Sequence, residues 1–177
     1  ERAEELAQSY SFAAEMLRFY KEITGFQKAV YGDLQSARPT DPGEQVNVIL
    51  PHIPSMLALV ARIGPPPLAA HAQKLLREGE GGWRLLTAGF WQWGIPTWSK
   101  KVFFVRVLLQ PYREYLADQT DKRLDYDPRT CPFCAGRPVV GVLRPEGYGA
   151  KRSMVCHLCS VEWDFPRIVC PACGESA

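Results

Sequence analysis

All six cysteines of this chain lie in three Cys-x-x-Cys motifs: Cys131-Pro-Phe-Cys134, Cys156-His-Leu-Cys159 and Cys170-Pro-Ala-Cys173. Each motif, called a knuckle below, places two thiolates on one side of a tight turn, at a separation that one tetrahedral metal ion can span. Two knuckles complete a shell of four sulfurs. The three knuckles therefore supply one whole metal site and half of another.

The segment between the first two knuckles predicts a β-hairpin. It is slightly longer than the about 15 to 20 residues usual for a four-cysteine ribbon. Residues 139–143 are rich in valine, 145–149 read Pro-Glu-Gly-Tyr-Gly, and 151–155 form the returning strand. Such a hairpin lets the two knuckles face each other, so we favour Cys131, Cys134, Cys156 and Cys159 as the closed site.

A second pairing of the knuckles is also open. Residues 160–169 separate the second and third knuckles and alternate Val161, Trp163 and Phe165 on one face, as in a short strand. A shorter ribbon could therefore form from Cys156, Cys159, Cys170 and Cys173. In the favoured pairing, Cys170 and Cys173 form a loosely held half-site instead.

Other uses of these cysteines are less favoured. Structural disulfides need an oxidising compartment and are spread over a fold, whereas these cysteines occur in close pairs. A redox Cys-x-x-Cys pair lies at the start of a helix, but these pairs lie among prolines and glycines. Four thiolates suit zinc or a rubredoxin-like iron equally. His157 lies inside a knuckle, yet either pairing already has four sulfurs, so we expect it not to be a ligand.

The composition indicates a soluble protein with a core. The chain has 177 residues, 46% of them hydrophobic, which allows one substantial domain and a small one. Its 21 basic and 19 acidic residues are interspersed, so charge alone does not indicate nucleic-acid binding. No apolar run reaches the length of a membrane span, and the first residues resemble neither a secretory signal nor a transit peptide. We expect a cytoplasmic protein.

The chain before the knuckles has the spacing of helices. Residues 1–31 carry apolar side chains every three or four positions, which predicts one long amphipathic helix whose inward face includes Tyr10, Met16 and Tyr20. Further helices are predicted over 55–63, 68–79 and 97–117, the last kinked at Pro111. A polar linker over 118–128 then leads into the first knuckle. Four tryptophans lie within 83–98. They either pack in the core where two helices meet or form an aromatic patch that binds a partner.

The order of these parts resembles the FdhE-type formate dehydrogenase accessory proteins. The resemblance covers nearly the whole chain and is strongest in the cysteine region. It rests on Glu15-Met-Leu-Arg18-Phe19-Tyr20, on Cys131-Pro-Phe-Cys134-Ala-Gly-Arg-Pro138, and on Cys156-His-Leu-Cys159-Ser-Val-Glu162-Trp163 followed by Arg167-Ile-Val-Cys170. It implies a helical domain, two rubredoxin-like metal modules and a role in the assembly of respiratory formate dehydrogenases through their catalytic subunits.

With the resemblance, the expected fold is multi-domain, α and β. A helical bundle spans 1–120, a rubredoxin-like or zinc-ribbon module spans 121–165, and 166–177 begin a second such module. Two departures from the family pattern stand out. Ala135 follows the first knuckle, where the family tends to have glycine. The family also has a fourth Cys-x-x-Cys pair, whereas this chain stops soon after Cys173, so we expect a truncated chain.

Three classes of function compete, and we expect a non-enzymatic assembly factor. The sequence shows no convincing nucleophile, general base or phosphate loop. A zinc-ribbon nucleic-acid binder would need basic residues beside a stacking aromatic, for which Arg144, Lys151, Arg152 and Arg167 near Trp163 are candidates. A rubredoxin-like electron carrier would need only iron. For an assembly factor, the predicted partner contacts lie between knuckles: Glu162, Trp163, Asp164 and Arg167. The alternative for Trp163 is that it packs beneath the hairpin.

Overall fold

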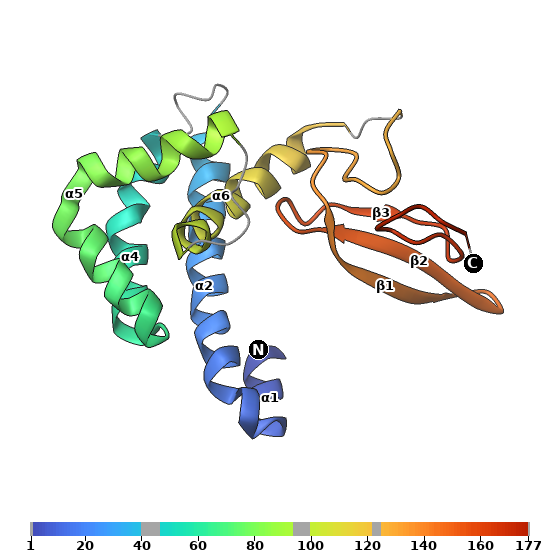
Figure 1. Cartoon of the computed structure of the whole chain (residues 1–177), viewed down its shortest axis with the longest axis horizontal. Helices are drawn as coiled ribbons and strands as arrows, with labels where there is room; N and C mark the ends of the chain where they lie inside the picture. Colours follow the sequence, from blue (N-terminus) through green and yellow to red (C-terminus); the bar gives the residue numbers. More distant parts are fainter. Residues whose placement is uncertain (1, 40–46, 94–99, 122–124, 177) are drawn as a thin grey trace. The chain divides into compact units, whose positions relative to one another are not determined.

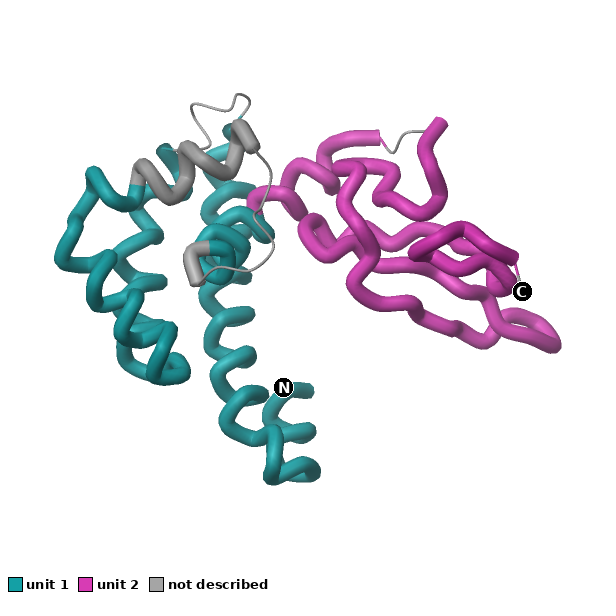
Figure 2. Tube along the Cα trace, in the orientation of Figure 1, with its two compact units in different colours: residues 1–111 teal, residues 112–177 magenta. Residues whose placement is uncertain are grey.

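The computed structural model describes residues 2–39, 47–93, 100–121 and 125–176 (Figure 1), and the side chains of 84–93, 100 and 101 lie outside the description. The chain divides into two compact units, Glu1–Pro111 and Tyr112–Ala177 (Figure 2). Each unit is described below by itself as unit 1 and unit 2. None of the described helices is both long enough and apolar enough to cross a membrane.

Unit 1 is helical. It contains α1 (Arg2–Ser9), the 3-10 turn η1 (Ser11–Ala13), α2 (Ala14–Ala37), the 3-10 turn η2 (Leu50–His52), α4 (Ile53–Ile63), α5 (Pro66–Trp93) and the first part of α6 (Lys100–Gln119). Its core contains side chains that are almost completely buried: Val30 and Leu34 of α2, Ile53, Met56, Leu57 and Val60 of α4, Ala72 of α5, and Phe104 and Leu108 of α6. The three-four spacing within each helix puts these residues on one inward face.

The single helix predicted over 1–31 is wrong. The chain breaks at Tyr10 (φ −126°), between α1 and η1, and α1 folds back beside the N-terminal end of α2 (Figure 1). Glu4 of α1 holds this arrangement by pairing with Lys21 of α2 at 2.9 Å. Tyr10, Met16 and Tyr20 are consequently at least half exposed, whereas Ile23 and Val30 of the same predicted face are buried, together with Leu34. The apolar spacing matched a helix but did not reveal where the chain reverses.

The later helices follow the sequence more closely. The predicted helix 55–63 corresponds to α4, and 97–117 corresponds to α6, which contains Pro111. Gly79 interrupts α5 with a φ of 67°, at the position where the sequence predicted a helix end. Trp83 donates its indole N–H to the Leu75 carbonyl at 2.8 Å, a contact inside unit 1. The other three tryptophan side chains of this region lie outside the described residues, so both interpretations of that patch stay predictions.

Unit 2 contains the predicted hairpin. Strands β1 (Pro138–Glu146) and β2 (Gly149–Cys156) pair antiparallel, and β3 (Glu162–Asp164) adds to β2, giving the order β1-β2-β3. Leu143 faces Arg152 across the first pair and Met154 faces Trp163 across the second. Met154, Trp163 and Phe165 are buried on this small sheet. The first knuckle thus lies just before β1, and the second lies between β2 and β3.

The division between the units falls within α6, whereas the sequence analysis placed a boundary after residue 120. The last turns of α6, from Tyr112 to Gln119, belong to unit 2. Pro111 lies at the division and has no N–H for the helical hydrogen-bond ladder.

Candidate metal centre

Four sulfur atoms from the first two knuckles come together in unit 2. Those of Cys131, Cys134, Cys156 and Cys159 all lie within 4.8 Å of one another. The shortest separations are 3.5 Å for Cys131–Cys159, 3.5 Å for Cys134–Cys156 and 3.6 Å for Cys134–Cys159. Sulfurs about 2.3 Å from a tetrahedral zinc ion are ~3.8 Å apart, whereas a disulfide needs ~2.05 Å. The four cysteines therefore lie close enough to bind one metal ion, in the pairing favoured from the sequence.

The backbone of each knuckle explains how its two thiols converge. The N–H of Cys131 donates to the Gly136 carbonyl at 2.8 Å, and the N–H of Cys156 donates to the Val161 carbonyl at 2.9 Å. Inside the turns, backbone N–H groups point at sulfur: those of Phe133 and Leu158 lie 3.4 Å from the sulfurs of Cys131 and Cys156. Such N–H donors favour the thiolate form that a metal requires.

Gly136 is a residue of the centre that the sequence analysis missed. A Cβ atom added to it would lie 3.1 Å from the sulfurs of both Cys134 and Cys156, and 3.1 Å from Cε1 of His157. A side chain there would press on the ligands themselves. A glycine so close after the first knuckle could have been singled out from the sequence. Its role, however, depends on contact with the second knuckle, which the sequence does not show.

Ala135 directly precedes it in a left-handed conformation (φ 57°), as does Ser160 (φ 55°) after the second knuckle. This conformation costs an L-residue about 1–2 kcal/mol, which explains why glycine suits the position. Alanine in place of the family's glycine therefore strains the backbone at this position. The hydrogen bond of the turn is kept, since the Ala135 N–H donates to the Cys131 carbonyl at 2.9 Å.

The four thiols perturb one another strongly. The hydrogen bond with Cys134 lowers the pKa of Cys131 to about 7, and hydrogen bonds with Cys131 and Cys134 lower the pKa of Cys156. The same contacts raise the pKa of Cys134 and of Cys159, because a second negative charge beside a thiolate is unfavourable. Four thiolates at these separations therefore need a cation among them, and a divalent ion would favour deprotonation of all four.

His157 lies beside the four sulfurs, and its hydrogen bond to Cys156 helps to lower the pKa of that thiol. Its Nδ1 lies 2.8 Å from the Arg137 carbonyl oxygen, which accepts a hydrogen bond from the ring, and its backbone N–H donates to the same carbonyl at 3.2 Å. The second knuckle is thereby joined to the chain that leaves the first. Among the described residues, the group of potential metal ligands consists of the four cysteines and does not include His157.

The third knuckle has the same turn but stands apart from the four-sulfur cluster. The N–H of Cys170 donates to the Glu175 carbonyl at 2.8 Å, the N–H of Gly174 donates to the Cys170 carbonyl at 2.9 Å, and Gly174 has a φ of 82°. Backbone N–H groups of the turn lower the pKa of Cys170. Within the described ranges, the group of potential ligands includes neither Cys170 nor Cys173. The alternative short ribbon is therefore not assembled.

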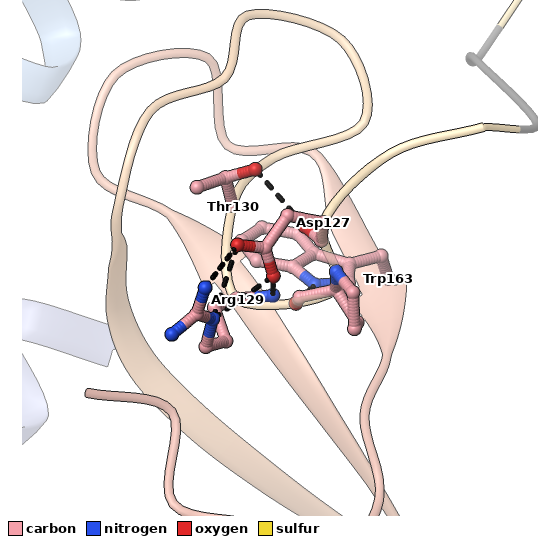
Figure 3. Close-up of polar contacts among 5 residues, drawn as sticks. Asp127, Arg129, Thr130 and Trp163 are labelled. Carbon is pink, nitrogen blue, oxygen red and sulfur yellow. Dashed lines mark hydrogen bonds and ion pairs between the residues drawn. The ribbon is translucent and has the colours of Figure 1, made fainter. Parts of the chain in front are cut away.

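The residues predicted to contact a partner have different environments. Glu162 pairs with Arg144 and accepts from Ser153, and Asp164 pairs with Lys151 at 2.8 Å. Arg167 is exposed. Trp163 is only 4% exposed, and its indole N–H donates to the Pro128 carbonyl at 2.8 Å (Figure 3). Burial makes Trp163 a packing residue of unit 2. The contact roles of Glu162, Trp163, Asp164 and Arg167 stay predictions.

The same ion pairs involve two of the basic residues that were candidates for nucleic-acid binding. Arg144 and Lys151 are neutralised by Glu162 and Asp164. Arg152 lies over the Phe165 ring, 5.3 Å from its centroid, and donates to the carbonyls of Arg167 and Val169. Three of the four candidate cations are therefore committed inside unit 2, so the nucleic-acid alternative is not favoured.

Comparisons with known proteins point to one family. The family model described as "FdhE, central domain" matches residues 130–167, the segment that contains the four-sulfur cluster. A protein named as an FdhE homologue from Stutzerimonas stutzeri is 39% identical over 60 residues, 33% of this chain and 20% of the relative. Another from Pseudomonas aeruginosa is 30% identical over 138 residues, 70% of this chain and 43% of the relative. The chain thus spans less than half the length of these curated relatives.

One solved structure has a similar fold over nearly the whole chain. The crystal structure of the FdhE protein from Pseudomonas aeruginosa superposes with a TM-score of 0.66 and 23% identity, covering 99% of this chain and 68% of that one. The resemblance predicted from the sequence is therefore confirmed.

Proposed function

Because the chain is of the FdhE type, we propose that it is a non-enzymatic accessory protein in the assembly of a respiratory formate dehydrogenase and that it contacts the enzyme's catalytic subunit. One observation carries the proposal: the segment matched by the FdhE central-domain model is the segment that brings four cysteine sulfurs within 4.8 Å. The proposal places the chain in the cytoplasm, where thiols stay reduced and available to a metal.

The proposed ligands are Cys131, Cys134, Cys156 and Cys159, and the proposed metal is zinc or iron. The four-thiolate donor set fits either ion. When bound, the ion would link the two knuckles across the hairpin, which matters because so small a sheet has little core of its own. The cysteines and their N–H donors would thereby hold the loops of unit 2 in one shape for a partner.

The proposed contact surface is the exposed part of the segment between the second and third knuckles. Asp164 and Arg167 are exposed, and Glu162 lies beside them on the end of β3. Trp163, buried among them, would support this segment through its hydrogen bond to Pro128. A surface of mixed charge on a rigid edge suits recognition of a protein rather than of a nucleic acid.

We also propose that residues 166–177 begin a second metal module. The third knuckle repeats the hydrogen bonds and the left-handed residue of the other two, so Cys170 and Cys173 would supply two of its four ligands.

The test is complementation of a strain that lacks this gene. A Cys131→Ser, Cys134→Ser variant should lose its metal, fail to co-purify with the catalytic subunit, and leave respiratory formate dehydrogenase activity low. The matched control is Tyr148→Ser, on the fully exposed hairpin tip, which should behave as wild type. If the soluble double variant restored full activity and still co-purified with the subunit, the cluster would have no part in the function.

A further inference from the structure

A recess of about 470 Å³ lies in unit 2, outside the four-sulfur cluster. Its lining comes from the loop before the first knuckle, the segment after that knuckle, and the turn of the third: Asp127, Arg129, Thr130, Arg137, Pro138, Pro171 and Ala172. The volume falls in the range of about 300–1,000 Å³ typical of ligand sites. None of the four clustered cysteines lines the recess, so we infer its ligand from the residues that do.

Arg129 is held in the recess by Asp127 (Figure 3). Its Nη2 donates to Asp127 Oδ2 at 2.7 Å, its Nε lies 3.0 Å from both carboxylate oxygens, and its backbone N–H donates to Oδ1 at 2.9 Å. The Asp127 carboxylate is therefore engaged by the residue two positions along. The same guanidinium packs within 3.4 Å of the position where Gly174 would have a Cβ atom, so it also borders the third knuckle.

Arg137 differs from Arg129 in the state of its guanidinium group, while the backbone of both residues is held by hydrogen bonds. Its carbonyl accepts from both the ring and the backbone N–H of His157, and it stands between Gly136 and Pro138. Over the ranges that the structure describes, its guanidinium makes no hydrogen bond or ion pair. Arg137 is an exposed residue of the lining, and its guanidinium has five N–H donors to offer a ligand. Its backbone is already ordered, which limits the entropy lost when a ligand binds.

The balance of groups favours a carboxylate with apolar neighbours. The lining contains two arginines and one aspartate, so it has a net positive charge. The Thr130 hydroxyl already donates to the Asp127 carbonyl at 2.9 Å, which leaves the arginines as the donors. Pro138, Pro171 and Ala172 provide apolar walls beside them. A bare inorganic ion would leave those walls without contacts, whereas a side chain on a peptide would cover them.

We propose that this recess binds an acidic segment of a polypeptide, with Arg137 as the principal, bidentate ligand of one carboxylate and Arg129 as the second cation. Guanidinium and carboxylate form two parallel hydrogen bonds in this arrangement. The inference concerns a site other than Glu162, Asp164 and Arg167, and it does not depend on which protein supplies the acidic segment.

The probe is a fluorescein-labelled peptide, acetyl-Pro-Glu-Ala-Glu-Pro-amide, titrated by anisotropy with the full chain at low ionic strength. Arg137→Gln should weaken binding by about tenfold or more, because a charge-assisted bidentate pair is lost. Arg137→Lys, which retains the charge but not the fork, should fall between this variant and wild type. Arg77→Gln removes the same charge from an exposed position on α5 and should change the affinity less than twofold. Dichroism and metal content should match wild type in all variants.

Several results would overturn the assignment. Equal weakening by Arg77→Gln and Arg137→Gln would mean general attraction by net charge. Equal binding of a peptide with glutamine for glutamate would remove the carboxylate from recognition. Displacement of the peptide by an equal concentration of inorganic phosphate would assign the recess to small anions. Failure of the wild-type chain to bind the peptide would leave the recess without the proposed ligand.

Discussion

Single residues that are not ligands control how closely the sulfurs approach. Gly136 leaves the space into which the sulfurs of Cys134 and Cys156 fit, and Ala135 adopts the left-handed conformation that turns the chain toward them. His157 then joins the two knuckles through the Arg137 carbonyl. Outer residues of this kind orient ligands and affect metal affinity through that orientation.

Gly136→Ala tests this control at the residue scale. Its Cβ would lie 3.1 Å from two sulfurs, so we expect metal affinity to fall about tenfold or more and unit 2 to lose about 1–3 kcal/mol of stability. The measurements are chelator competition and thermal unfolding. Gly141→Ala is the matched control, because its Cβ would meet Met154 at an ordinary 3.5 Å. Equal affinities for both variants would show that the space at Gly136 is dispensable.

At the scale of elements, side-chain contacts between residues distant in sequence hold α1, β2 and β3 to other parts of their own unit. Glu4 ties α1 to α2 through Lys21 and Arg18. Trp163 ties β3 to the loop that precedes the first knuckle, and Arg152 ties β2 to the carbonyls that precede the third. Because the partners lie far apart in sequence, none of these ties follows from periodicity.

The tie between α1 and α2 predicts a dependence on pH. Hydrogen bonding and charge from Lys21 lower the pKa of Glu4 below 4.5. The docking of α1 should therefore be fully supported above pH 4.5 and weaken as the pH falls through the lower, folded pKa. Carboxyl NMR titration should show Glu4 titrating below 4.5, and Lys21→Met should move its pKa back upward. An unchanged Glu4 pKa in Lys21→Met would contradict the assigned cause.

At the scale of the whole molecule, the two units differ in what stabilises them. Unit 1 has a hydrophobic core of fully buried side chains on several helices. Unit 2 has a three-stranded sheet, a few buried aromatic and sulfur-containing side chains, and four thiols that repel one another once ionised. A structure with so small a core needs a metal or another cross-link.

Metal removal should therefore affect the two units unequally. With a strong chelator and a reducing agent, we expect amide protection to be lost along β1, β2 and β3, while α2 and α4 keep theirs and most of the helical dichroism remains. Hydrogen exchange followed by mass spectrometry measures the protection of each unit separately. Parallel loss of protection in α2 and α4 would show instead that unit 1 depends on the metal. The same sample identifies the ion by elemental analysis.

The sequence by itself determined those features that arise from contacts between near neighbours in the chain. The three knuckles, the hairpin between the first two, the break at Gly79 and the helices α4 and α6 follow from local spacing and turn chemistry. The favoured grouping of Cys131, Cys134, Cys156 and Cys159 could be predicted for the same reason, since one hairpin brings the two knuckles together. The resemblance to FdhE-type proteins was likewise carried by local motifs.

Only the tertiary structure decided what depends on approach between distant segments. The reversal at Tyr10 leaves side chains that fit a helical face exposed, and it places Glu4 beside Lys21 and buries Ala7. Trp163 proved to be buried because Pro128, far from it in sequence, offers a carbonyl to its indole. Two further contacts could not be predicted from the sequence: the approach of two sulfurs to Gly136, and the hydrogen bond of His157 to the Arg137 carbonyl. Spacing along a chain specifies which side chains share a face, whereas packing in three dimensions specifies what that face meets.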